Sequence, residues 1–191
     1  AFTAPHANNE ANRDLKNGQE VPDFGSYADK EWSAPNKGQA AMISRMDRDI
    51  GRLFELLKKL GLDEHTLVLF SSDNGPHNEG GHTPELFQPA GPLRGMKRSL
   101  TEGGIRVPFV VSWPARLKPA VFEAPTVQLD LHATALAAAG VAAKAEWKLE
   151  GVDLLPYLSG QNKAAPHEAL YWRFGEQMAI RQGNWKLVRY D

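Results

Sequence analysis

The sequence predicts an α/β fold that ends in a small antiparallel subdomain. Three observations predict it: a long amphipathic helix leads directly into an apolar strand, a second strand precedes another helix, and three alternating runs close the chain. Alternating helices and strands are typical of an α/β core, whereas consecutive alternating runs with short turns indicate an antiparallel meander. We expect the core to occupy residues 1–165 and the subdomain to begin with residues 166–191.

The long helix is expected to begin near Asn36 and to end at Gly61. Its apolar side chains recur at spacings of 4, 4, 3, 4 and 3, in the set Met42, Met46, Ile50, Leu53, Leu57 and Leu60. This period places them on one helix face, and charged residues occupy the other. By contrast, residues 7–36 are polar and rich in Asn, Asp, Gly and Pro. We expect them to form a surface excursion with at most short helical turns.

Two apolar runs are expected to form buried strands, and three alternating runs are expected to form a meander. The run "TLVLF" (Thr66 to Phe70) is apolar and bounded by polar residues, which predicts a parallel core strand buried on both faces. The run "VPFVVSWP" (Val107 to Pro114) predicts a second buried strand, and Asp130 to Ala139 predicts a helix that Gly140 ends. Farther on, "GVDLLPYLSG" predicts a short helical turn, while "EALYWRF", "QMAIR" and "NWKLVRY" predict the meander.

The composition and net charge of the chain exclude several classes of function. The chain has 191 residues, of which 42% are hydrophobic and 24% charged, as in globular domains. A net charge of -1 without a basic block argues against nucleic acid or a membrane surface as the partner. The chain has no Cys, which excludes a disulfide framework, cysteine-ligated zinc and a Cys nucleophile within it. Its first residues, "AFTAPHANNE", look like the end of a strand and its loop, so we expect a fragment.

A polar loop follows the "TLVLF" strand. Asp73 and Asn74 come at the carboxyl end of this strand, the edge where open α/β sheets bind ligands. Two neighbouring oxygen-bearing side chains there suit a hard cation such as calcium or magnesium, although the same pair also suits an Asx turn. Residues 74–106 hold 7 Gly and 4 Pro in 33 positions, and so long a connection is usually functional or disordered. Lys97 and Arg106 favour a functional loop.

Four segments of the sequence resemble one family. "DNG" followed by "LRGMKRSLTEGGIRVP" resembles the calcium site and lysine segment of the sulfatases, members of the alkaline-phosphatase superfamily that cleave sulfate esters with a formylglycine nucleophile. "AFTAPH" is similar to the family's strand and active-site histidine, "GVDLLPYLSG" to a late core segment, and "AIRQGNWKLVRY" to its C-terminal subdomain. The resemblance implies the C-terminal part of an alkaline-phosphatase-like α/β/α core, and a periplasmic, secreted or lysosomal location.

The resemblance also implies roles for individual residues. Asp73 and Asn74 would be calcium ligands, Lys97 would contact the sulfate and its bridging oxygen, and His6 would lie beside the leaving oxygen. A cation and fixed donors stabilise the negative charge that develops on a departing oxygen, and histidine can supply a proton near neutral pH. The implied partner is a small-molecule or glycan sulfate ester. Five further residues also match the family and are interpreted as architectural: Glu102, Gly103, Gly104, Arg106 and Pro108. The glycines are expected to form a tight turn, and Arg106 a buried ion pair.

The chain departs from the family pattern in two respects. It lacks the Cys/Ser-x-Pro-x-Arg motif from which formylglycine arises, since "SAPNK" at Ser33 to Lys37 ends in Lys, and it lacks the two further Asp ligands that the family carries near its N-terminus. We therefore expect the nucleophile to lie outside this chain and the chain alone to be inactive. Two alternatives remain. A phosphodiesterase or phosphonate hydrolase of the same superfamily would usually carry His in place of Asn74 and two transition metals, and a pseudoenzyme module would lack the nucleophile altogether.

His77 and His82 flank "NEGG" in the same loop and suggest a zinc pair at first sight. No third ligand follows at a sensible spacing, so we expect no zinc site. We expect both histidines to line the mouth of the substrate site instead.

Overall fold

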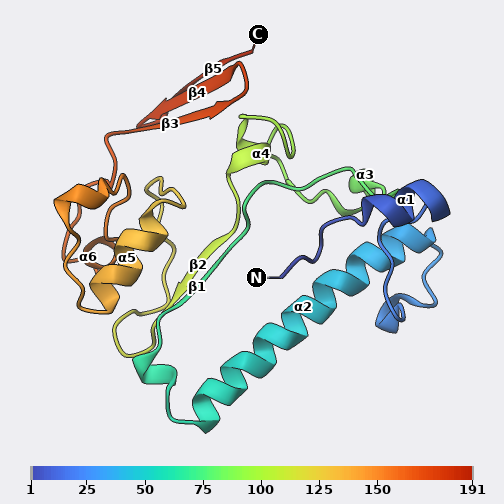
Figure 1. Ribbon diagram of the computed structural model, residues 1–191, viewed down its shortest axis with the longest axis horizontal. Helices are drawn as coiled ribbons and strands as arrows, with labels where there is room; N and C mark the ends of the chain where they lie inside the picture. The colour runs from blue at the N-terminus through green and yellow to red at the C-terminus, as the bar shows by residue number, and fades with distance from the viewer. Residues whose placement is uncertain (1, 191) are drawn as a thin grey trace. The chain divides into compact units, whose positions relative to one another are not determined.

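The computed structural model describes residues 2–190 (Figure 1), which divide into two compact units. The first unit contains the described residues up to Leu60 together with Asn74–Arg106. Its elements are α1 (Asn9–Leu15), the 3-10 turn η1 (Gly25–Tyr27), α2 (Ala34–Lys59), α3 (Pro84–Phe87) and α4 (Glu102–Ile105). The second unit contains Gly61–Asp73 and the described residues from Val107 onward. The domain boundary expected between residues 165 and 166 stays a prediction.

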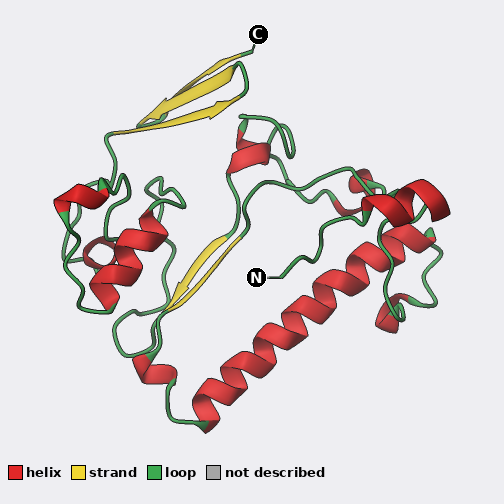
Figure 2. Cartoon of the chain, viewed as in Figure 1, coloured by secondary structure: helices red, strands yellow, loops and turns green. Residues whose placement is uncertain are grey.

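The second unit holds two sheets and several short helices. Its elements are η2 (Asp63–His65), β1 (Val68–Ser71), β2 (Phe109–Ser112), α5 (Asp130–Ala138), η3 (Ala145–Trp147), α6 (Leu155–Leu158), β3 (Ala169–Phe174), β4 (Gln177–Gln182) and β5 (Trp185–Arg189). Figure 2 shows that long loops connect many of the helices and strands. Within residues 2–190, no helix combines the length and the apolar character that crossing a membrane requires.

Helix α2 confirms the predicted long helix, and its observed ends lie within two residues of the predicted ones. Ser33 is its N-cap: the backbone there is extended, and the Asn36 N–H donates to the Ser33 hydroxyl at 3.4 Å. The helix ends where Gly61 adopts a left-handed φ of 66°. Only the first turns are buried, and within them a Cβ at Gly38 would overlap the Gln19 carbonyl oxygen. The polar segment before α2 contains short helices, as expected.

The pairing of β1 with β2 corrects one expectation. The two strands are antiparallel, with Val68 opposite Ser112 and Ser71 opposite Phe109, whereas the sequence predicted a parallel core strand. The residues of β1 are half-buried, and Val110 of β2 is 54% exposed. An apolar, β-branched run favours a strand but carries no information on its direction. Here the long connection brings the chain back beside β1, and β2 pairs with it in the opposite sense.

Helix α5 is fixed in the second unit by a buried carboxylate. Asp130 is fully buried and accepts the Val127 and Val152 N–H groups, each at 2.9 Å. The His167 Nε2 lies 2.9 Å from both oxygens of the same carboxylate. One turn on, the Thr134 hydroxyl accepts the Leu154 N–H at 3.0 Å. These contacts join α5 to the segment before α6 and to the chain that leads into β3.

The last three strands form the predicted antiparallel meander, in the order β3-β4-β5. Tyr171 lies opposite Ile180, and Ile180 lies opposite Leu187. The alternating pattern predicted this sheet because its turns are short, and Gly175 and Gly183 adopt left-handed φ angles of 61° and 53° there. Leu170 and Ala179 are the buried residues of the sheet, with 8% and 2% exposure.

Candidate active site

Backbone hydrogen bonds hold the glycine-rich loop of the first unit in place. The Gly75 N–H donates to the Gly104 carbonyl at 2.8 Å, and the Gly103 N–H donates to the Arg94 carbonyl at 2.7 Å. A Cβ at Gly75 would overlap the Gly103 carbonyl oxygen, so glycine is required by close approach of two backbones. The Lys97 N–H donates to the Pro76 carbonyl at 2.8 Å. The loop therefore places Lys97 beside the residues that follow Asn74.

One architectural expectation is confirmed in this loop and another is corrected. Gly103 and Gly104 lie in the single turn of α4, where the Gly104 N–H donates to the Thr101 carbonyl at 3.0 Å and both glycines permit close backbone contact. The buried ion pair expected for Arg106 is wrong, because this residue is exposed. Its charge lies at the C-terminal end of α4 instead.

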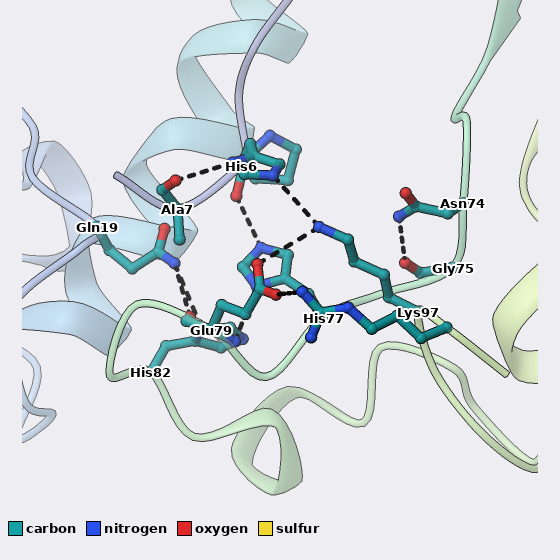
Figure 3. A network of polar contacts seen from close by, with 11 residues as sticks. His6, Ala7, Gln19, Asn74, Gly75, His77, Glu79, His82 and Lys97 are labelled. Atoms are coloured by element: carbon teal, nitrogen blue, oxygen red, sulfur yellow. Dashed lines mark hydrogen bonds and ion pairs between the residues drawn. The ribbon is translucent and has the colours of Figure 1, made fainter. Parts of the chain in front are cut away.

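Lys97 and His6 are brought together from positions 91 residues apart (Figure 3). The Lys97 Nζ lies 3.3 Å from the His6 Nε2 and 3.4 Å from the Glu79 Oε2. The side chains of Lys97 and Glu79 are each 19% exposed, whereas His6 is exposed. A histidine, an ammonium group and a carboxylate thus form one row of polar contacts at the surface of the first unit.

The contacts of His6 define which of its ring nitrogens carries hydrogen. The His6 Nδ1 lies 2.8 Å from the Ala7 carbonyl oxygen, which can only accept, so Nδ1 donates. The Lys97 ammonium can only donate, so the His6 Nε2 accepts from it. In this arrangement the lone pair of Nε2 faces the lysine. A proton that His6 gives away from Nε2 must first reach that nitrogen.

Glu79 is the residue that connects the cations of the site. Its Oε1 accepts from the Arg98 guanidinium at 2.6 Å, while its Oε2 faces Lys97. Burial alone would raise the pKa of the Glu79 carboxyl, but the charges of Lys97 and Arg98 and the hydrogen bond from Lys97 outweigh burial and lower it. Sequence reasoning missed Glu79. The available signal was an acidic residue between the two loop histidines, and that signal is weak without contacts.

His77 and His82 have backbone partners. The His77 Nε2 donates to the Pro5 carbonyl at 3.0 Å, and its Nδ1 accepts the Glu79 N–H at 3.1 Å. The His82 Nδ1 donates to the Glu79 carbonyl at 2.8 Å. Both rings are buried, with 8% and 7% exposure, and their centroids lie 5.0 Å apart. Their burial indicates a structural role in place of the substrate contact expected from the sequence.

Burial lowers the pKa of His77 below its ordinary value, and the hydrogen bond to Pro5 and the neighbouring charges of His82, Glu79 and Lys97 modify this effect. The fold therefore favours neutral His77. This stabilisation is complete above the unfolded-state pKa of about 6.5 and is lost as the pH falls from there toward the lowered folded-state pKa.

We expect the melting temperature to fall less between pH 7.5 and pH 5.5 in His77→Gln than in the unsubstituted protein, because glutamine does not titrate. Thermal melting at both pH values measures this. His132→Gln, which replaces an exposed histidine of α5, is the matched control and should leave the pH dependence of the wild type unchanged. Equal acid sensitivity of the His77→Gln and wild-type proteins would contradict the assignment.

The two residues expected to bind calcium lie one on each side of the division between the units. Asn74 belongs to the first unit and is half-buried, and its Nδ2 donates to the Gly75 carbonyl at 2.8 Å (Figure 3). Asp73 belongs to the second unit and is exposed. Among residues 2–190, no group of three or more His, Cys, Asp or Glu side chains is arranged to hold a metal ion. The calcium role of Asp73 and Asn74 stays a prediction.

Comparison with known families identifies the family of this chain. The profile described as "Sulfatase" matches residues 1–141, and the profile described as "N-sulphoglucosamine sulphohydrolase, C-terminal" matches residues 96–191. The chain therefore belongs to the sulfatase family, as the resemblance implied.

Two relatives and one solved structure illustrate the similarity. Steryl-sulfatase of Mus musculus is 37% identical over 132 residues, which are 68% of this chain and 21% of that protein. N-acetylgalactosamine-6-O-sulfatase of Bacteroides thetaiotaomicron is 30% identical over 153 residues, which are 77% of this chain and 30% of that protein. This chain thus spans less than a third of either relative.

The solved structure is that of Ps i-CgsB in complex with k-i-k-neocarrahexaose. It matches this chain with a TM-score of 0.79 and 28% sequence identity, over 100% of this chain and 40% of its own. The similarity confirms the predicted α/β class and the alkaline-phosphatase-like fold.

Proposed function

We propose that the complete enzyme, meaning the whole protein to which this chain belongs, is a sulfatase that hydrolyses sulfate esters. The observation that carries the proposal is the 3.3 Å contact between the Lys97 Nζ and the His6 Nε2. These are the two residues that the family resemblance makes catalytic, and the fold brings them together from opposite ends of the first unit. Membership of the sulfatase family supports the same activity.

In the proposed reaction, Lys97 contacts the sulfate at its bridging oxygen, and His6 faces this same oxygen, which leaves with the alcohol. Negative charge moves onto the leaving oxygen as its bond to sulfur breaks, so fixed N–H donors stabilise the transition state more than the bound ester. His6 accepts from Lys97 through Nε2. The proton that the departing alcohol requires would reach Nε2 from solvent, while the Lys97 ammonium keeps its charge and its donors.

Asp73 and Asn74 are proposed to hold a calcium ion. Their side chains fit this role in part: Asp73 is an exposed carboxylate, and Asn74 directs its amide nitrogen to Gly75, which turns its oxygen to the other side. Calcium takes about 6 to 8 oxygen ligands, so further residues must complete the shell. Bound calcium would supply positive charge for the anionic ester. The formylglycine nucleophile is proposed to come from a Cys/Ser-x-Pro-x-Arg segment outside this chain.

The proposed substrate is a sulfated glycan. Two similar proteins support this class, because one is called an N-acetylgalactosamine-6-O-sulfatase and the other was solved with k-i-k-neocarrahexaose. The loops of the first unit would select the sugar, since residues 7–36 and 76–93 are mostly loop, with only the short elements α1, η1 and α3 and the start of α2.

The complete enzyme is expected to release sulfate from para-nitrophenyl sulfate and, faster, from sulfated oligosaccharides. Chelation should lower the rate and calcium should restore it, because the ion stabilises negative charge in the transition state. Sulfate release with and without chelator is the measurement, and magnesium is the control for ion identity.

Other results would favour the alternatives. Faster cleavage of a phosphonate monoester than of any sulfate ester would favour a phosphonate hydrolase. Inactivity toward both substrate classes, together with an upstream sequence that lacks Cys/Ser-x-Pro-x-Arg, would favour a pseudoenzyme.

A further inference from the structure

Glu79 forms hydrogen bonds through its main chain as well as through its carboxylate, which a surface salt bridge does not need. Its N–H donates to the His77 ring, and its carbonyl accepts from the Gln19 side chain at 3.1 Å and from His82 at 2.8 Å. Its two carboxylate oxygens face Lys97 and Arg98. Both main-chain polar groups and both ends of the carboxylate are thus engaged, which fixes the position of this side chain (Figure 3).

The backbone conformation of Arg98 allows both Lys97 and Arg98 to contact Glu79. Arg98 adopts a left-handed φ of 75°, which costs free energy for a residue with a side chain. Neighbouring residues of an extended chain point to opposite sides, yet Lys97 and Arg98 both reach Glu79. The unusual φ at Arg98 lies directly beside the residue that the proposed function makes catalytic.

Charge and geometry together indicate what Glu79 does. One carboxylate and two cations leave a net charge of +1, so Arg98 offsets the repulsion that Glu79 would otherwise exert on a sulfate. A lysine ammonium has three N–H donors. Contacts to Glu79 and His6 direct two of them, and the direction of the third is then determined. A flexible lysine side chain thereby becomes a fixed donor before substrate arrives.

We propose that Glu79 is a positioning residue that orients the Lys97 ammonium toward the reacting ester. The proposal rests on the proposed function, because it assumes that Lys97 contacts the sulfate. A purely stabilising role explains the contacts of Glu79 less well than a positioning role does. Ion pairs near the surface contribute only about 0 to 1 kcal/mol to stability.

The test is a double-mutant cycle in the complete enzyme, with Glu79→Gln, Lys97→Ala and the double variant. Glu79→Gln is expected to lower kcat about 10- to 100-fold, because small displacements of a catalytic donor are costly. KM should stay equal or fall, since a negative charge near the anion is removed. In the Lys97→Ala background, Glu79→Gln should change kcat by less than about two-fold, because a residue that acts through Lys97 has nothing left to position.

Two further variants complete the experiment. Glu79→Asp keeps the charge but withdraws the carboxylate by one methylene, so it should lower kcat while the melting temperature stays close to that of the wild type. This variant preserves the test if Glu79→Gln fails to fold. Glu55→Gln, which replaces an exposed glutamate of α2 in the same unit, is the matched control and should retain wild-type kcat.

The outcomes separate this proposal from the proposed function. Normal turnover of Lys97→Ala would overturn both. If Lys97→Ala is impaired, full activity of Glu79→Asp would overturn the positioning role alone. An equal loss from Glu79→Gln in both backgrounds would overturn it as well, because Glu79 would then act independently of Lys97. Loss of kcat confined to the background that contains Lys97 supports it.

Discussion

Lys97→Ala is expected to lower the turnover of the complete enzyme about 100- to 1,000-fold, the usual cost of removing one preorganised donor from a developing negative charge. The fold should lose only about 1 kcal/mol or less, as for most substitutions near the surface. Glu79 keeps its contact with Arg98 when Lys97 is removed, so no carboxylate is left without a cation. The loss therefore falls on catalysis and hardly on stability.

Steady-state kinetics on an activated sulfate ester, beside thermal melting of the same variants, measure both effects. Lys97→Arg should restore activity only in part, because a planar guanidinium cannot place one compact charge at the position of Nζ. Lys58→Ala is the matched control and should retain wild-type turnover, since this lysine of α2 in the same unit has an exposed side chain. Near-normal turnover of Lys97→Ala, or lost activity that follows a lowered melting temperature, would show that Lys97 is structural.

Local patterns predicted most of the regular elements. The period of apolar residues from Met42 to Leu60 predicted α2, because a helix returns its side chains to one face every three or four residues. Alternation with short turns predicted the meander from Ala169 to Arg189. The direction of β2 beside β1 was not predictable in this way, since direction depends on the path of the intervening loop.

The site was predictable only in part. Local chemistry alone leaves His6 and Lys97 as an ordinary loop histidine and an ordinary charged residue, and the family resemblance was needed to pair them. Glu79 matches no motif that the sequence offers, because its role depends on contacts with residues 18 and 19 positions away and on the backbone of Arg98. A contact of this kind is a property of the folded loop.

The second large effect is expected at Asp130, which the sequence predicted only as the first residue of a helix. The carboxylate is fully buried, and three donors depend on it: the N–H groups of Val127 and Val152 and the His167 ring. Removing one partner of a buried, hydrogen-bonded group leaves the others without acceptors, and each such donor costs free energy because water cannot reach it. Asp130 also joins three segments of the second unit, so its loss separates elements that are distant in sequence.

Asp130→Ala is therefore expected to reduce the free energy of unfolding of the complete enzyme by about 3 to 5 kcal/mol, the usual cost of breaking a buried pair. Urea unfolding of wild type and variant measures the difference from the transition midpoints at equal slopes. Glu150→Ala is the matched control, because it removes an exposed carboxylate from the same unit and should change stability by less than about 0.5 kcal/mol. A loss below about 1 kcal/mol in Asp130→Ala would mean that solvent or a neighbouring group satisfies the three donors, since substitutions without a buried partner rarely cost more.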